Sequence, residues 1–234
     1  TTAVAVMYRF LQHLASNLSP LTFNLDYYIP DRYTEGYGVS QQGIDYAAAQ
    51  GCTLIITLDC GIKAVEKIAY ANSKGIDVIV CDHHTPGDEL PAAVAVLNMK
   101  RHDCPYPYKD LSGCGVGFKL AQAYTQRYLA SSLSPDSLIA LLPLTQLLAM
   151  SIASDIVPIT GENRILAHFG IKQINQAPFV GISAIINIAG IEDKKLTINE
   201  LVYKIGPRIN ACGRMKSGRA AVELLLTDDA TFAR

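Results

Sequence analysis

The chain has 234 residues, of which 50% are hydrophobic and 18% are charged, and its formal net charge at pH 7 is −1. A chain of this length can bury a large core as one unit, and its composition excludes a disordered protein. The balanced charge excludes a globally basic nucleic-acid-binding protein, so contact with nucleic acid would need a local basic patch.

Cysteine spacing and apolar runs bear on the cellular compartment. The six cysteines form no CxxC pair, and the sequence shows no signal peptide and no unbroken apolar span of about 20 residues. We therefore expect a cytoplasmic protein with no membrane partner.

The first half of the chain alternates between helical and strand patterns. Apolar spacing predicts a helix over residues 1–17, a short strand near 25–29, a glycine-containing loop over 30–38 and a helix over about 40–50. Runs rich in β-branched residues at 53–58 and 77–81 predict buried parallel strands joined by a helix over 63–73. A third strand is expected at 93–97, followed by a loop rich in proline and tyrosine over 98–110.

The second half of the chain is helical in pattern. Helices are expected from Gly115 to Gln126, from about 137 to 153, over 162–175 and 181–189, and from near Arg219. The predicted fold is therefore an α/β domain, with a parallel β-sheet flanked by helices and additional helices toward the C-terminus.

Acidic and imidazole side chains follow the two predicted parallel strands. Asp59 comes directly after the first, and Asp82, His83 and His84 follow the second. Because loops at the carboxyl ends of parallel strands converge, these groups should face a common volume. Such a ligand mixture suits Mn²⁺ or Mg²⁺, with imidazole favouring Mn²⁺. Taken alone, Asp59 is equally compatible with a helix cap, and the pair of clusters is what favours a metal site.

Five stretches give the chain a specific resemblance. These are LIITLDCGI, GIDVIVCDHHTPGDELPAAVAVLN, CPYPYKDLSGCGVGFKLA, SIASDIVPITGENRIL and GPRINACGRM. In order and spacing they resemble the catalytic core of RecJ-type exonucleases of the DHH phosphoesterase superfamily, whose signature is Asp-His-His. The resemblance extends from the first residue to the last.

The resemblance implies roles for individual residues. Asp59 would bridge two metal ions, and His83 and Asp155 would complete the protein ligands of the second ion. His84 would face the scissile phosphate, while Asp82 would orient an imidazole, as metal-site histidines commonly require. Phosphate oxygens would be bound by Arg208, Asn210 and Arg214.

Two segments near the implied site have alternative interpretations. The glycine-rich turn at 112–117 could direct backbone amides at a phosphate, or it could only allow tight packing at a helix start. Tyr106 and Tyr108 could stack on bases, or they could hold their loop against the core.

The resemblance also implies missing parts. RecJ proteins carry an Asp-Tyr-Asp-x-Asp-Gly motif on a first strand, just before a helix resembling TTAVAVMYRFLQHL. We expect residues 1–217 to be a DHH catalytic domain without that strand and motif, and 218–234 to begin a helix leading to an absent DHHA1 domain. One of the two metal sites would then be largely lost, and the fragment itself would be weak or inactive.

The implied function is 5′-to-3′ hydrolysis of single-stranded DNA in recombination and repair, by a two-metal mechanism using Mn²⁺ or Mg²⁺. Single-stranded DNA would be the substrate, with a single-strand-binding protein or a helicase as further partners. Two alternatives stay open: a DHH phosphodiesterase acting on oligoribonucleotides or cyclic dinucleotides, and a catalytically inactive nucleic-acid-binding scaffold.

Overall fold

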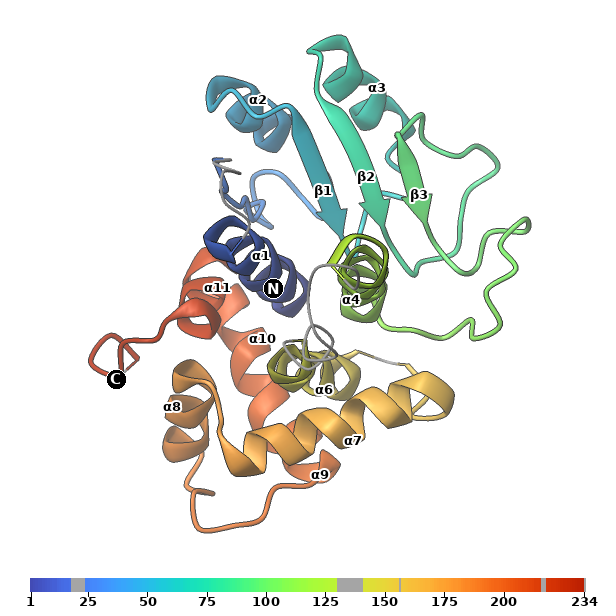
Figure 1. Cartoon of the computed structure of the whole chain (residues 1–234). Helices are drawn as coiled ribbons and strands as arrows, with labels where there is room; N and C mark the ends of the chain where they lie inside the picture. The colour runs from blue at the N-terminus through green and yellow to red at the C-terminus, as the bar shows by residue number, and fades with distance from the viewer. Residues whose placement is uncertain (18–23, 130–140, 156, 216–217, 234) are drawn as a thin grey trace.

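The computed structural model describes residues 1–17, 24–129, 141–155, 157–215 and 218–233, except for the side chains of 212–215 (Figure 1). In chain order, with η marking a 3-10 or π turn, its elements are α1 (Thr2–Asn17), α2 (Gln41–Ala49), β1 (Leu54–Leu58), α3 (Val65–Ser73), β2 (Asp77–Cys81), β3 (Ala95–Leu97), α4 (Gly113–Tyr124), η1 (Thr125–Leu129), η2 (Leu142–Leu144), α6 (Thr145–Ser154), α7 (Gly161–Gln176), α8 (Val180–Ile188), α9 (Ile198–Glu200), η3 (Leu201–Ile205), α10 (Gly206–Met215) and α11 (Gly218–Leu226).

The strands form one parallel sheet in the order β1-β2-β3. Leu58 pairs with Cys81, and Cys81 pairs with Leu97, so the three strands end at the same level. The backbone amide of Asp59 extends the pairing by donating to the Cys81 carbonyl at 2.8 Å. The residues that follow β1 and β2 therefore share one edge of the sheet, which lies beside α4 (Figure 1).

Both faces of the sheet are covered, as expected for parallel strands. On one face Val78 and Val80 pack with Ile44 of α2 and Ile68 of α3. On the other face Cys81 packs with residues at and before the start of α4, including Leu111 and Val116. Successive side chains of β2 thus enter different cores, which fixes the register of the strand.

The largest apolar core lies in the helical half of the molecule. It combines α1, α4 and α6 with the C-terminal helices, and Leu147 and Leu148 of α6 are fully buried in it. Figure 1 shows α6 between α4 and α7 in this half. The C-terminal helix α11 joins the same core through Leu225, and the guanidinium of Arg9 on α1 donates to the last carbonyls of α11, at 3.2 Å for Leu225 and 3.1 Å for Leu226.

The predicted α/β fold class is confirmed, and so are the helices and parallel strands expected over the described residues. The strand expected near 25–29 is wrong, because residues 24–30 form no strand. The carboxylate of Glu35 anchors this segment instead, accepting from the Tyr28 hydroxyl at 2.9 Å and from the Asp31 amide at 2.8 Å. The start of the helix expected over 137–153 falls outside the described residues.

Two further observations concern the helices. Among the described helices, none combines the length and hydropathy needed to cross a bilayer. The stretch GPRINACGRM, for which we predicted no secondary structure, forms α10 and continues the helical turn η3.

A tight crossing of α6 and α7 generates a stability prediction. A Cβ added to Gly170 would lie 2.1 Å from the carbonyl oxygen of Thr145. We expect Gly170→Ala to lower the free energy of unfolding by about 1–3 kcal/mol through overpacking, although alanine is the better helix former. Urea unfolding would measure the change. Gly115→Ala in α4 is the control, since its nearest neighbour would be the Ser112 hydroxyl at 3.4 Å. Equal stability of Gly170→Ala and the parent would contradict the packing described.

Candidate metal centre

Asp59 directly follows β1 and has a left-handed backbone, with a φ of 64°. It is the single non-glycine residue with positive φ in the part of the chain that the structure describes. A conformation of this kind costs roughly 1–2 kcal/mol for most residues and less for aspartate, and it concentrates at functional sites. The bond from its amide to Cys81 holds Asp59 in this turn, at the edge where the strands end.

The first residue of α4 packs directly on the Asp59 side chain. A Cβ on Gly113 would lie 2.0 Å from Asp59 Oδ1, so only glycine fits at this position. The preceding residue, Ser112, caps the helix by accepting from the Gly115 amide at 3.1 Å. The Asp59 carboxylate therefore lies at the positive end of the α4 dipole. These contacts favour the tight-packing interpretation of the glycine-rich turn.

His83 is the most enclosed of the candidate ligands, with a side chain only 9% exposed. Its Nδ1 lies 3.1 Å from the carbonyl oxygen of Leu111. A carbonyl can only accept, so Nδ1 carries the proton and the neutral ring presents an unprotonated Nε2. That Nε2 lies 3.2 Å from Asp59 Oδ1 and 3.5 Å from Asp155 Oδ2.

The environment of His83 acts on its pKa in opposing directions. Burial by itself lowers the pKa, but the hydrogen bond with Asp59 and the charge of Asp155 outweigh it, so the pKa of His83 is raised. The two carboxylates therefore favour a positive charge beside the imidazole, and a divalent ion could supply it.

The arrangement fits a divalent cation. In an octahedral shell with bonds of about 2.1 Å, neighbouring ligand atoms lie about 3.0 Å apart, which is close to the two distances at His83 Nε2. Ligand atoms of Asp59, His83 and His84 also lie within 4.8 Å of one another. Within the described ranges this is the one cluster of three or more histidine, cysteine or acidic residues with ligand atoms so close, and Asp155 is not a member of it. Asp155 approaches the cluster at His83 Nε2, which lies 3.5 Å from its Oδ2.

Asp82 is buried behind the cluster, with a side chain only 2% exposed. Its carboxylate accepts from the Ile62 amide at 2.9 Å, the His83 amide at 2.8 Å and His84 Nδ1 at 2.7 Å. Burial raises the pKa of Asp82, but the bonds from Ile62 and His84 outweigh it and the pKa is lowered. Asp82 therefore remains a carboxylate that orients His84, whose side chain is 60% exposed.

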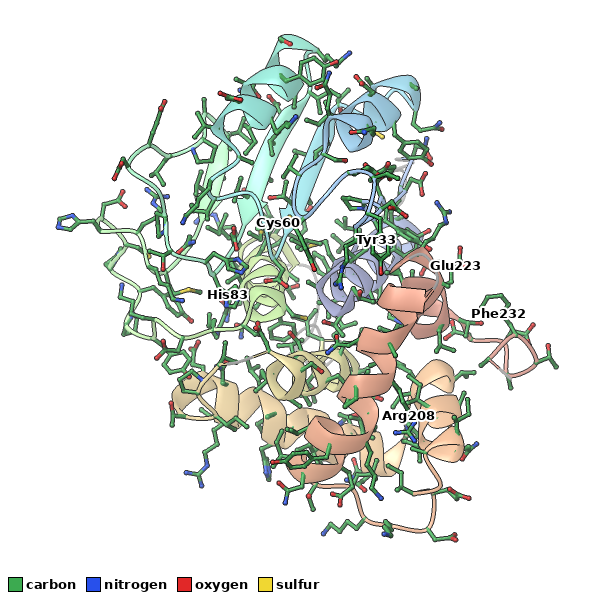
Figure 2. All side chains as sticks on the ribbon, turned by 180° about the vertical axis from the view of Figure 1, so that it is seen from behind. Tyr33, Cys60, His83, Arg208, Glu223 and Phe232 are labelled. Atoms are coloured by element: carbon green, nitrogen blue, oxygen red, sulfur yellow. The ribbon has the colours of Figure 1, made fainter. Side chains whose placement is uncertain are left out.

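The expected phosphate-binding residues lie apart from this cluster. Arg208 and Asn210 are exposed on α10, and the Arg208 guanidinium donates to the Lys204 carbonyl at 2.6 Å. Figure 2 shows Arg208 on the α10 ribbon, well away from His83. The side chain of Arg214 lies outside the described part. The structure thus brings Asp59, Asp82, His83, His84 and Asp155 together, but it does not bring Arg208 to them.

The structure adds groups that the sequence did not single out. The Leu111 carbonyl orients His83, Gly113 makes room for Asp59, and the Asn98 side-chain amide donates to the His84 carbonyl at 2.8 Å. Asn98 and Gly113 lie inside stretches that carried the family resemblance. Leu111 acts through its backbone, so no property of its side chain could have marked it.

Comparison with known proteins agrees with this geometry. Residues 1–145 match the model of the DHH family, N-terminal domain. The chain is 37% identical to the single-stranded-DNA-specific exonuclease RecJ of Bacillus subtilis, over 97% of this chain and 27% of that protein. It is 40% identical to the protein of the same name from Escherichia coli, over 90% of this chain and 37% of that protein. The chain thus spans about a third of the length of these relatives.

Solved structures show the same relationship. A crystal structure of exonuclease RecJ bound to manganese matches with a TM-score of 0.80 and 32% identity, over 99% of this chain and 55% of that chain. A Mn²⁺ complex of RecJ from Thermus thermophilus matches with a TM-score of 0.74 and 29% identity, over 99% of this chain and 31% of that one. Because the model of the DHH family matches more than half of its residues, the chain belongs to that family. Within the family it is similar to RecJ exonucleases.

Proposed function

We propose that the chain is the metal-binding core of an exonuclease that hydrolyses phosphodiesters in single-stranded DNA. The observation that carries the proposal is the position of His83 Nε2 between Asp59 and Asp155, at 3.2 and 3.5 Å. The relatives that share this fold are named as single-stranded-DNA-specific exonucleases, and RecJ structures have been solved with manganese and magnesium.

Each residue of the cluster has a proposed role. Asp59 would be shared between two ions, and His83 and Asp155 would complete the protein ligands of one of them. Asp82 holds His84 by its Nδ1, so the opposite nitrogen of the exposed His84 ring is available to a phosphate oxygen. A bound pair of divalent ions would activate water and stabilise the departing oxygen.

Ligands for the other ion would come from residues that precede Thr1 in longer relatives. α1 packs against α4 near the site, because Ala3 of α1 and Cys114 of α4 are buried in the same core. Cys114 is adjacent to Gly113, which contacts Asp59. A segment entering α1 would therefore pass close to Asp59, where the family's Asp-rich motif could supply carboxylates.

Residues of α10 suit a different part of the substrate. Arg208, Asn210 and Arg214 would bind phosphates of the strand beyond the scissile one, because Arg208 lies away from His83 (Figure 2). We place the boundary of the DHH domain at 217, with residues 218–234 leading toward a second domain that would close the channel. Strand polarity, 5′ to 3′ as in the family, would depend on that domain.

Several wider assignments belong to the same proposal. The substrate implies a cytoplasmic enzyme of recombination and repair, supplied with single strands by a helicase or a single-strand-binding protein. A phosphodiesterase of oligoribonucleotides or cyclic dinucleotides is less well supported, since the relatives described above all carry the RecJ name. An inactive scaffold is disfavoured by the convergence of Asp59, His83 and Asp155.

Two substitutions of Asp59 distinguish the effect of its carboxylate on metal binding from the effect of its left-handed backbone on stability. We expect Asp59→Asn to lose most of the Mn²⁺-dependent rise in melting temperature, because it loses a charged ligand while keeping the left-handed turn. Asp59→Gly should lose the same rise yet melt at a slightly higher temperature than Asp59→Asn in chelator, because glycine adopts the left-handed backbone without strain. An unchanged Mn²⁺ effect in Asp59→Asn would refute the ligand assignment.

Nuclease activity provides the functional test. We expect this chain to degrade 5′-labelled single-stranded DNA with Mn²⁺ several powers of ten more slowly than a version extended at both ends to the length of its relatives. One complete metal site cannot both activate water and stabilise the leaving oxygen, and losing such stabilisation costs several kcal/mol. The extended protein carrying His83→Ala is the control for contaminating nuclease. Equal turnover by the short and extended proteins would overturn the two-metal assignment.

A further inference from the structure

A buried amide joins the two loops that carry the candidate ligands. Asn163, in the first turn of α7, is completely buried. Its Nδ2 donates to the carbonyl oxygen of Asp110 at 2.6 Å and to that of Pro158 at 2.9 Å. Asp110 and Pro158 are 48 residues apart in the sequence, so the two hydrogen bonds link distant segments of the chain.

Each of the bonded carbonyls is close to a ligand. Asp110 precedes Leu111, whose carbonyl fixes the proton on Nδ1 of His83. Pro158 lies three residues after Asp155, which caps the end of α6. Asn163 thus bonds to the residue before the acceptor that orients His83 and to a residue three positions after Asp155.

Neighbouring side chains reinforce the same junction. The Tyr108 hydroxyl donates to the Thr160 carbonyl at 2.8 Å, and its ring occupies the space that a Cβ on Gly161 would need, 2.6 Å away. The Tyr106 hydroxyl donates to Glu162 at 2.7 Å. Residues 106–110 therefore pack on the start of α7. Of the two interpretations of Tyr106 and Tyr108, these contacts favour the one in which the tyrosines hold their loop against the core.

The amide at 163 is only partly paired. Its Oδ1 is the one buried side-chain nitrogen or oxygen in the described part of the chain with no hydrogen-bond partner. An unpaired buried acceptor typically costs about 1–3 kcal/mol, so this amide stabilises the fold less than a fully paired one would. Its two donated bonds are what distinguish it from an apolar residue of the same size.

We propose that Asn163 is a positioning residue of the metal centre, which sets the orientation of His83 and its separation from Asp155 without touching the ion. The role of Asn163 in metal binding rests on the proposed function. Its role in orienting the His83 imidazole does not. Partners that orient metal-binding histidines commonly contribute a factor of about 10 to 100 in metal affinity.

The test compares two buried amides that differ in their position relative to the site. Asn163→Ala should lower Mn²⁺ affinity, measured by calorimetry on this chain well below its melting temperature, by about tenfold or more. Gln146→Ala is the matched control. Gln146 is also buried, donating to the Ala177 carbonyl and accepting from the Phe179 amide, both at 3.0 Å, at the end of α6 opposite Asp155. It should destabilise the protein while leaving the affinity within about twofold. Mn²⁺ affinity of Asn163→Ala equal to that of the parent would overturn the proposal.

A second readout needs no metal. In chelator, and at a pH high enough for the His83 ring to be neutral, NMR of the imidazole nitrogens should show His83 of the parent and of Gln146→Ala with its proton on Nδ1, and a mixture of tautomers in Asn163→Ala. If the parent binds no Mn²⁺ but this difference appears, the positioning role stands and the metal proposal fails. If Asn163→Ala does not fold, Tyr108→Phe, which removes one hydroxyl from the same junction, should show the same changes at smaller amplitude. An unaltered His83 tautomer in the folded variant contradicts the proposal.

Discussion

Parallel pairing of β1 with β2 fixes where the acidic groups of the site can lie. Leu58 is in register with Cys81, so Asp59 and Asp82 are the first residues beyond two adjacent strand ends. The backbones turn there in different ways. Asp59 takes a left-handed conformation and its side chain is 46% exposed, whereas Asp82 is buried and accepts from three backbone amides and the His84 imidazole. One carboxylate is thereby available to a cation, and the other supports the imidazole beside it.

The site also depends on close packing from outside the sheet. Gly113 lets the start of α4 approach the Asp59 carboxylate, and the residue two positions earlier, Leu111, orients His83. α6 contributes Asp155 at its end, and α6 is held in the largest core by Leu147 and Leu148. Three separate elements must therefore keep their spacing to within a fraction of an ångström for one imidazole nitrogen to meet two carboxylates. The two hydrogen bonds of Asn163 join the segment before α4 to the segment after α6.

Sequence patterns predicted the parts of this arrangement that periodicity controls. The two buried strands and the polar residues after them follow from β-branched runs and chain order, which is why Asp59 and the Asp82 to His84 stretch were placed correctly at one edge of the sheet. Asp155 was identified only through family resemblance, since nothing local marks it. Contacts made by backbone carbonyls, as at Leu111, could not be predicted because they depend on tertiary packing. The strand expected near 25–29 does not form, and the segment is held through the Tyr28 hydroxyl, which donates to Glu35.

The central claim is that Asp59, His83 and Asp155 hold one divalent ion. Anomalous diffraction at the manganese edge, from crystals of this chain grown with Mn²⁺, tests it most directly. The account predicts a peak roughly 2.0–2.3 Å from Asp59 Oδ1, His83 Nε2 and Asp155 Oδ2, with water completing the shell. A well-occupied manganese peak elsewhere in the molecule, with no density between these three atoms, would contradict it.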